Sequence, residues 1–96
     1  MPDDVRHDPD ARRFTLSTDA GAAVLAYEPR GTGVAFTHTV VPEAARGQGV
    51  GERLVRGALA EARTRGWAVV PECPFVADYL RGHPADQDLL APGTAA

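Results

Sequence analysis

The sequence contains no lysine, isoleucine or asparagine, and it has a single cysteine. Without lysine the chain has neither a Walker A phosphate loop nor a Schiff-base lysine. Cys73 has no partner for an internal disulfide, whereas a secreted domain this small would be expected to carry several. No apolar run approaches the roughly 18 residues of a membrane span and no signal peptide is visible, so we expect a cytoplasmic protein. The missing residue types, together with abundant alanine, arginine and glycine, indicate the GC-rich codons of a bacterial genome.

A chain of 96 residues is enough for one domain and too short for two. Its composition, 44% hydrophobic and 24% charged, is that of a globular protein. Ten arginines against thirteen acids give a net charge of -3, which argues against nucleic acid as the main partner. We expect residues 1–11 to be a flexible lead-in, residues 12–90 to form the domain, and residues 91–96 to be a flexible tail.

The first half of the domain carries strand patterns. Phe14 and Leu16 alternate with polar residues, and residues 22–28 and 34–41 form two further runs, each preceded by turn residues. These three strands predict an antiparallel meander.

The second half changes period. From Val50 the apolar residues recur at helical spacing until Gly66, which is a typical helix stop. Residues 67–71 predict a short buried strand, and Pro74 suits the first position of a helix that runs to Gly82. The predicted order is β-β-β-α-β-α, an α/β fold.

The segment Arg46-Gly47-Gln48-Gly49-Val50-Gly51 joins the third strand to the first helix. Its glycines let a diphosphate approach the backbone amides at the helix start, where Arg46 and Arg53 can add charge-assisted hydrogen bonds. Glu52 stands where a Rossmann motif needs its third glycine, and a meander precedes the loop, so a Rossmann fold is excluded. On the glycines alone, a plain connecting loop remains an equal alternative.

Four segments in this order resemble the GCN5-related N-acetyltransferase superfamily, and in particular a branch of very small proteins, the YjdJ or NATD1-like type. They are His38-Thr39-Val40-Val41-Pro42, the glycine segment, Val70-Pro71-Glu72-Cys73-Pro74-Phe75-Val76 and Tyr79-Leu80-Arg81-Gly82-His83-Pro84. The resemblance covers about residues 13–90. It implies a minimal fold of that superfamily, in which residues 67–71 lie parallel to the third strand.

The resemblance also implies a groove for acetyl-coenzyme A. The diphosphate would lie on the glycine segment, the pantetheine arm along the end of the third strand, and the thioester near Cys73. The implied cofactor-binding residues are Thr39, Val40, Val41, Arg46, Gly47, Gln48, Gly49, Val50, Gly51 and Arg53. The implied activity is transfer of an acetyl group to an amine. The alternative is a coenzyme A-binding module without turnover, because the chain lacks the helices that usually shape an acceptor pocket.

Three residues are candidates for catalysis, each with a structural alternative. Cys73 precedes a predicted helix start, where a thiolate is stabilised, but a lone cysteine is also a common core residue. Tyr79 matches a tyrosine that in the superfamily protonates the leaving thiolate, or it packs in the core. His38, on the same predicted strand face as Val34 and Phe36, could be a general base or a hydrogen-bonded core histidine.

Other candidates are weaker. Glu43 could be a base, although a loop glutamate is more often solvated, and His83 fits a turn. The histidines and Cys73 show no metal-ligand spacing, so no metal is expected. The expected partners are acetyl-coenzyme A and an amine acceptor, with no nucleic acid and no membrane, and the thin core allows a monomer or a homodimer.

Overall fold

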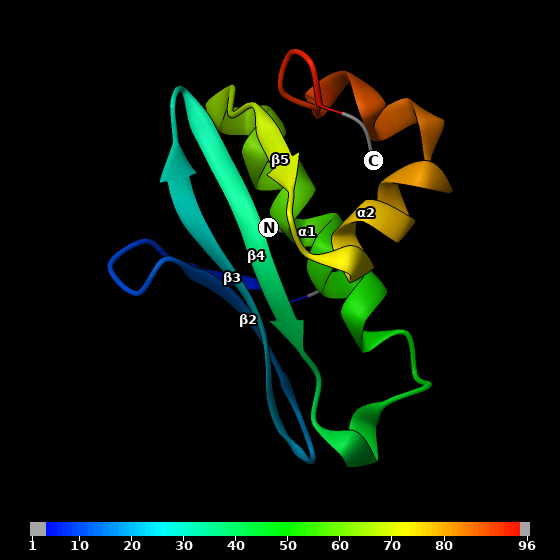
Figure 1. Cartoon of the computed structure of the whole chain (residues 1–96). Helices are drawn as coiled ribbons and strands as arrows, with labels where there is room; N and C mark the ends of the chain where they lie inside the picture. The colour runs from blue at the N-terminus through cyan, green and yellow to red at the C-terminus, as the bar shows by residue number, and fades with distance from the viewer. Residues whose placement is uncertain (1–3, 95–96) are drawn as a thin grey trace.

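The computed structural model describes residues 4–94, which form a five-stranded sheet with helices packed on one of its faces (Figure 1). The strands lie in chain order: β1 (Arg6–Asp8), β2 (Arg13–Thr18), β3 (Gly21–Arg30), β4 (Gly33–Val40) and β5 (Val69–Pro71). The first four are antiparallel to their neighbours, and β5 is parallel to β4. The predicted meander and the parallel partner of its last strand are therefore confirmed.

The helices are α1 (Val50–Arg65) and α2 (Pro74–Arg81), accompanied by the 3-10 helices η2 (Glu43–Ala45) and η3 (Pro84–Leu89). The apolar stripe of α1 packs on β2 and β3, and α2 packs on β4. Gly66 ends α1 in the left-handed conformation, with φ +69°, and its N–H donates to the carbonyls of Ala62 and Arg63. No helix within residues 4–94 is both long and apolar enough to cross a membrane.

The N-terminal segment differs from the predicted lead-in, because residues 6–8 form β1 and pair with β2. Val5 is buried against α1, where a side chain on Gly57 would come within 2.8 Å of it. The imidazole of His7 stacks on Phe14. A strand of three residues is too short to show a period, and it is held by pairing with β2 and by contacts such as that of His7 with Tyr27, so no local pattern predicts it. Residues 1–3 lie outside the described residues.

The C-terminal segment is also held on the sheet at its start. The N–H of Ala91 donates to the carbonyl of Val69 at 2.9 Å, and Leu90 bridges to the same residue. The predicted tail therefore begins with an anchored residue, and its last two residues, 95 and 96, lie outside the described residues.

A β-bulge in β4 decides which side chains face the helices. Tyr27 pairs with Phe36 while Ala26 pairs with His38, so Thr37 is an extra residue in β4. Phe36 before the bulge is fully buried, and His38 after it is exposed. The prediction that His38 shares a face with Val34 and Phe36 is wrong, because the bulge reverses the alternation and turns Thr39 toward the helices instead.

Candidate functional site

The end of β4, the loop that follows it, and the starts of α1 and α2 lie at one end of the molecule (Figure 1). Their residues line a groove of about 530 Å³. The residues that line it are Thr39, Val40, Val41, Ala45, Arg46, Gly47, Gly49, Val50, Gly51, Glu52 and Phe75. All predicted cofactor-binding residues except Gln48 and Arg53 are among them. The Gln48 amide instead donates to the carbonyl of Ala44 at 3.4 Å.

The glycine loop forms one end of the groove. Gly47 and Gly49 have φ values of +82° and +75°, which side chains other than glycine's rarely allow, and no atom lies within 4 Å of a Cβ built on either residue. Glycine is therefore required at both for backbone conformation, and the space beside them is open. The first amide to close a helical bond is that of Arg53, which donates to Gly49.

The start of α1 is suited to an anion. Gly49 is its N-cap and offers no side chain to the amides of the first turn, which have no acceptor inside the helix. The positive end of the helix dipole lies at the same place. Arg46 adds a guanidinium to the lining, and its Nε donates to the carbonyl of Val41 at 3.2 Å, which ties the loop to the end of β4.

The groove continues beside β4, where β4 and β5 separate. Strand pairing between them ends at Phe36 and Pro71, and the last link is the N–H of Cys73 donating to the carbonyl of Phe36 at 2.8 Å. Within residues 4–94 no strand pairs with residues 37–40 on that side. The backbone there is an open strand edge that an extended ligand could pair with.

Cys73 lies behind this edge, at the N-cap of α2. It is buried, with 4% of its surface exposed, and its Sγ is 3.3 Å from the hydroxyl oxygen of Thr39. Thr39 lines the groove and Cys73 does not. The thiol is therefore connected to the groove by its contact with the side chain of Thr39. This contact depends on the bulge at Thr37, which no pattern in the sequence predicts.

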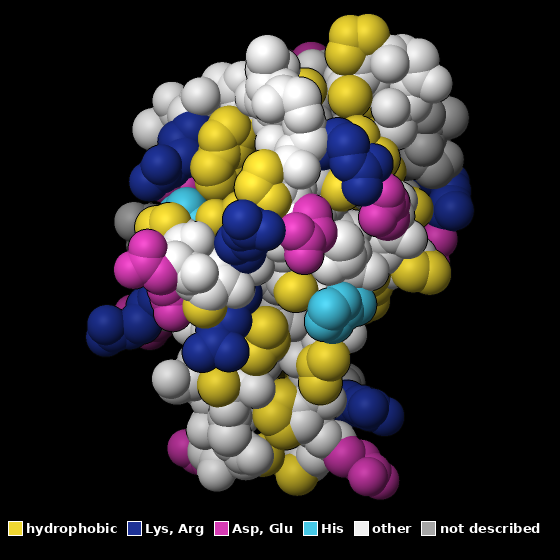
Figure 2. Space-filling view, turned by 60° about the vertical axis from the view of Figure 1, so that its left-hand side comes forward, with side chains coloured by type: hydrophobic (Ala, Val, Ile, Leu, Met, Phe, Trp, Pro, Cys, Tyr) yellow, Lys and Arg dark blue, Asp and Glu magenta, His cyan; other side chains and the backbone are white. Residues whose placement is uncertain are grey.

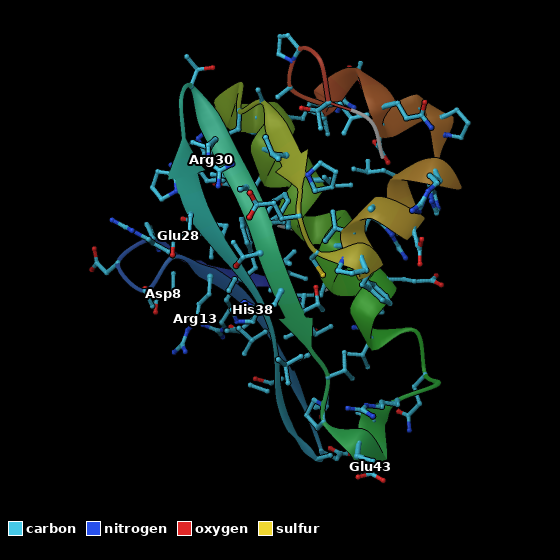
Figure 3. The ribbon with its side chains drawn as sticks, viewed as in Figure 1. Asp8, Arg13, Glu28, Arg30, His38 and Glu43 are labelled. Carbon is cyan, nitrogen blue, oxygen red and sulfur yellow. The ribbon has the colours of Figure 1, made fainter. Side chains whose placement is uncertain are left out.

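The other two catalytic candidates lie elsewhere. Tyr79 is 9% exposed and its ring stacks on His83, with centroids 3.8 Å apart, while the Nδ1–H of His83 donates to the Tyr79 carbonyl. Neither residue lines the groove. His38 lies on the sheet face opposite the helices, with its Nδ1 3.2 Å from the Thr37 hydroxyl (Figure 3).

Charged groups show no single-sign field on the face of the sheet that is free of helices. Arginine and acidic side chains are mixed across that view (Figure 2). Glu43 is exposed in η2 and does not line the groove (Figure 3), whereas Glu52 does. In the part of the chain that the structure describes, no three histidine, cysteine, aspartate or glutamate side chains are grouped to hold a metal ion.

Comparison with known proteins identifies the family. The profile of a family described as GCN5-related N-acetyl-transferase matches residues 13–89, from β2 through η3, and so includes the whole groove. The chain belongs to this family. It is also similar to the protein NATD1 of chicken (Gallus gallus), with 32% identity over 91 residues, which are 92% of this chain and 83% of NATD1.

These similarities confirm the predicted resemblance and the minimal fold of the family. They support an acetyltransferase function in general terms. Ala45, Glu52 and Phe75 also line the groove and were not predicted as site residues; Phe75 is the aromatic one. It follows Pro74 on the side of α2 away from the buried Val76 and Leu80, which is the available signal for an exposed aromatic residue.

Proposed function

We propose that this protein transfers an acetyl group from acetyl-coenzyme A to an amine. The observation that carries the proposal is the continuity of the groove, which runs from the glycine loop and the start of α1 to the open edge of β4. A coenzyme A molecule has a diphosphate, an extended arm with amide groups, and a thiol end. The loop amides and Arg46 fit the diphosphate, and residues 37–40 offer backbone groups to the arm.

The reaction requires the amine nitrogen to attack the thioester carbonyl carbon. The carbon–sulfur bond breaks, the acetyl group remains on nitrogen, and the coenzyme A thiolate leaves. An amine that binds as ammonium must lose one proton before attack and a second after it. Cys73 with Thr39 is our first candidate for this proton transfer, or for a transient acyl thioester, because the Cys73 thiol is within hydrogen-bond distance of Thr39, which lines the groove.

A second function is favoured by a specific observation. The strands β2 and β3 are joined by a tight turn at residues 19 and 20, so no element there encloses an acceptor, and Cys73 is buried behind Thr39. A coenzyme A-binding module without turnover would have the same groove. Release of free coenzyme A from acetyl-coenzyme A in the presence of polyamines, small amines and lysine peptides separates the two functions.

The donor site is tested by thermal unfolding with coenzyme A. A ligand that binds only the folded state at 100 times its Kd adds about 2.7 kcal/mol, which for a domain of this size corresponds to a rise in Tm of about 11–22 °C. Gly49→Asp should remove this rise, because it places a carboxylate at the anion end of the groove.

Gly66→Asp is the matched control. Gly66 has a similar positive φ, +69°, with open space around it, but it lies at the opposite end of α1 and does not line the groove. This variant should keep the rise in Tm. Stabilisation by NAD or ATP but not by coenzyme A would show that the proposed donor is wrong.

A further inference from the structure

Gly51 differs from the other two glycines of the loop. Gly47 and Gly49 need glycine for their positive φ, whereas Gly51 lies inside α1 without such a conformation. A Cβ built on Gly51 would lie 2.7 Å from Cζ of Phe75. Glycine inside a helix costs about 0.5–1 kcal/mol relative to alanine. The close contact with Phe75 therefore explains why a side chain is absent at this position.

The residues before and after Phe75 fix its position in the chain. The N–H of Cys73 is bonded to β4, and Val76 in the next position is fully buried. The ring of Phe75 rests on the backbone of α1 at Gly51, and 40% of the residue remains exposed. Its exposed part belongs to the lining of the groove.

Val41 contributes a second apolar surface to the same groove, just beyond the end of β4. It lines the groove and is partly buried against the hydrophobic core. Val40 also borders the groove, but its side chain lies on the helix-free face with His38, because the register pairs Val40 with Val24 and His38 with Ala26. Apolar groups gathered in one groove indicate a ligand with an apolar part.

We propose that Phe75, seated on Gly51, and Val41 form an apolar clamp that binds the alkyl portion of the donor's extended arm. This proposal rests on the proposed function, because it assigns the clamp to coenzyme A. In this arrangement Gly51 acts on the ligand through Phe75. The diphosphate is held separately, by the amides at the start of α1 and by Arg46.

The clamp and the anion site can be separated with two ligands. Coenzyme A contains the diphosphate and the arm, whereas ADP contains the diphosphate without the arm. Phe75→Ala should raise the Kd of coenzyme A about ten-fold, because about 1.4 kcal/mol of apolar contact is lost. It should change the Kd of ADP less than two-fold. Phe75→Leu, which keeps an apolar side chain, should lie between the wild type and Phe75→Ala for coenzyme A.

Gly51→Ala tests the contact between Gly51 and the Phe75 ring. The added methyl group must displace the Phe75 ring, so the Kd of coenzyme A should rise several-fold. In the Phe75→Ala background the same substitution should have less than a two-fold effect, because no ring remains to be displaced.

The control for Gly51→Ala is Gly57→Ala. It makes the same substitution in the same helix and meets a comparable obstacle, because its Cβ would lie 2.8 Å from Val5, which does not line the groove. It should lower Tm and leave the Kd of coenzyme A unchanged. Calorimetric or NMR titration gives each Kd, and thermal unfolding verifies that each variant folds.

Three results would overturn the clamp: an unchanged Kd of coenzyme A in Phe75→Ala, equal losses for coenzyme A and ADP, or additive effects of Gly51→Ala and Phe75→Ala. In each of these the wild type still binds coenzyme A, so the proposed function survives. If the wild type binds ADP but gains nothing from the arm of coenzyme A, both the clamp and the proposed donor are wrong.

Discussion

His7 should contribute more to stability than its place near the N-terminus indicates. Its Nε2 is 2.6 Å from the Tyr27 hydroxyl, its ring stacks on Phe14 with centroids 4.4 Å apart, and its side chain is 5% exposed. His7→Ala removes an aromatic pair worth about 0.5–1.5 kcal/mol. It also leaves the Tyr27 hydroxyl without this partner, at a cost of about 1–3 kcal/mol. We expect the free energy of unfolding to fall by about 2–4 kcal/mol.

The same residue predicts a pH dependence. Burial lowers the pKa of His7 below its ordinary value of 6.5, and the nearby Arg65 lowers it further, while Glu61, 3.6 Å from Nδ1, and Asp8 oppose the shift. His7 is then neutral in the folded state at a pH where the unfolded chain already takes up a proton. Stability is therefore complete above pH 6.5 and is lost as the pH falls from 6.5 toward the lower pKa of the folded state.

Other groups around His7 act outside this window. The hydrogen bond from Arg65 lowers the pKa of Glu61 below 4.5, so the stability from that carboxylate is lost only at more acidic pH. Burial raises the pKa of Tyr27 above 10. The interval from pH 7.5 to 5.5 therefore reports on His7 rather than on Glu61 or Tyr27.

Urea unfolding of the wild type and of His7→Phe at pH 7.5 and 5.5 is the assay. His7→Phe keeps an aromatic ring and removes the titration, so it should lose less stability than the wild type between the two pH values. All other titratable groups are present in both proteins, so the difference between them reports on position 7. An equal pH dependence in both, or a loss below 0.5 kcal/mol in His7→Ala at pH 7.5, would refute the reasoning.

Two further predictions concern the β4–β5 pair and the groove. Gly33→Ala should lower the free energy of unfolding by about 3 kcal/mol or more, because its Cβ would lie 1.8 Å from the Ala68 carbonyl oxygen, where β4 and β5 begin to pair. Gly31→Ala is the control: its Cβ would lie in open space, so urea unfolding should show a loss of about 1 kcal/mol. Cys73→Ala and Thr39→Val should each lower the rate of acetyl transfer at least ten-fold and change the Kd of coenzyme A less than two-fold. Thr39→Ser, which keeps the hydroxyl, should be close to the wild type. Full activity in Cys73→Ala would show that the thiol only packs in the core.

Local patterns were sufficient for most of the fold. The stripe that begins at Val50 and the stop at Gly66 predicted α1, and alternation with turn residues predicted β2, β3 and β4. β1 could not be predicted, because three residues carry no period and the contacts of His7 are with residues such as Tyr27, twenty positions away. A short strand at the edge of a sheet is defined by its partners.

The bulge at Thr37 shows the same limit inside the site. A regular strand would place His38 beside Phe36 on the core face, where it would be either a hydrogen-bonded core histidine or a candidate general base. The register with β3 inserts one residue, which exposes His38 and turns Thr39 toward Cys73. Because the extra residue is defined by pairing with another strand, the alternation within β4 contained no sign of it.

The glycines of the loop make a related point about motifs. As a motif, Gly47, Gly49 and Gly51 have one explanation, the close approach of a diphosphate. In the structure, two of them are required by backbone conformation and the third by contact with Phe75, which lies 24 residues further along the chain. Gly51 and Phe75 therefore constrain one another, and alanine at Gly51 requires either that the Phe75 ring moves or that the residue at position 75 is smaller. The residues that can be accommodated at position 51 thus depend on the residue at position 75, although no local pattern in the sequence connects the two positions.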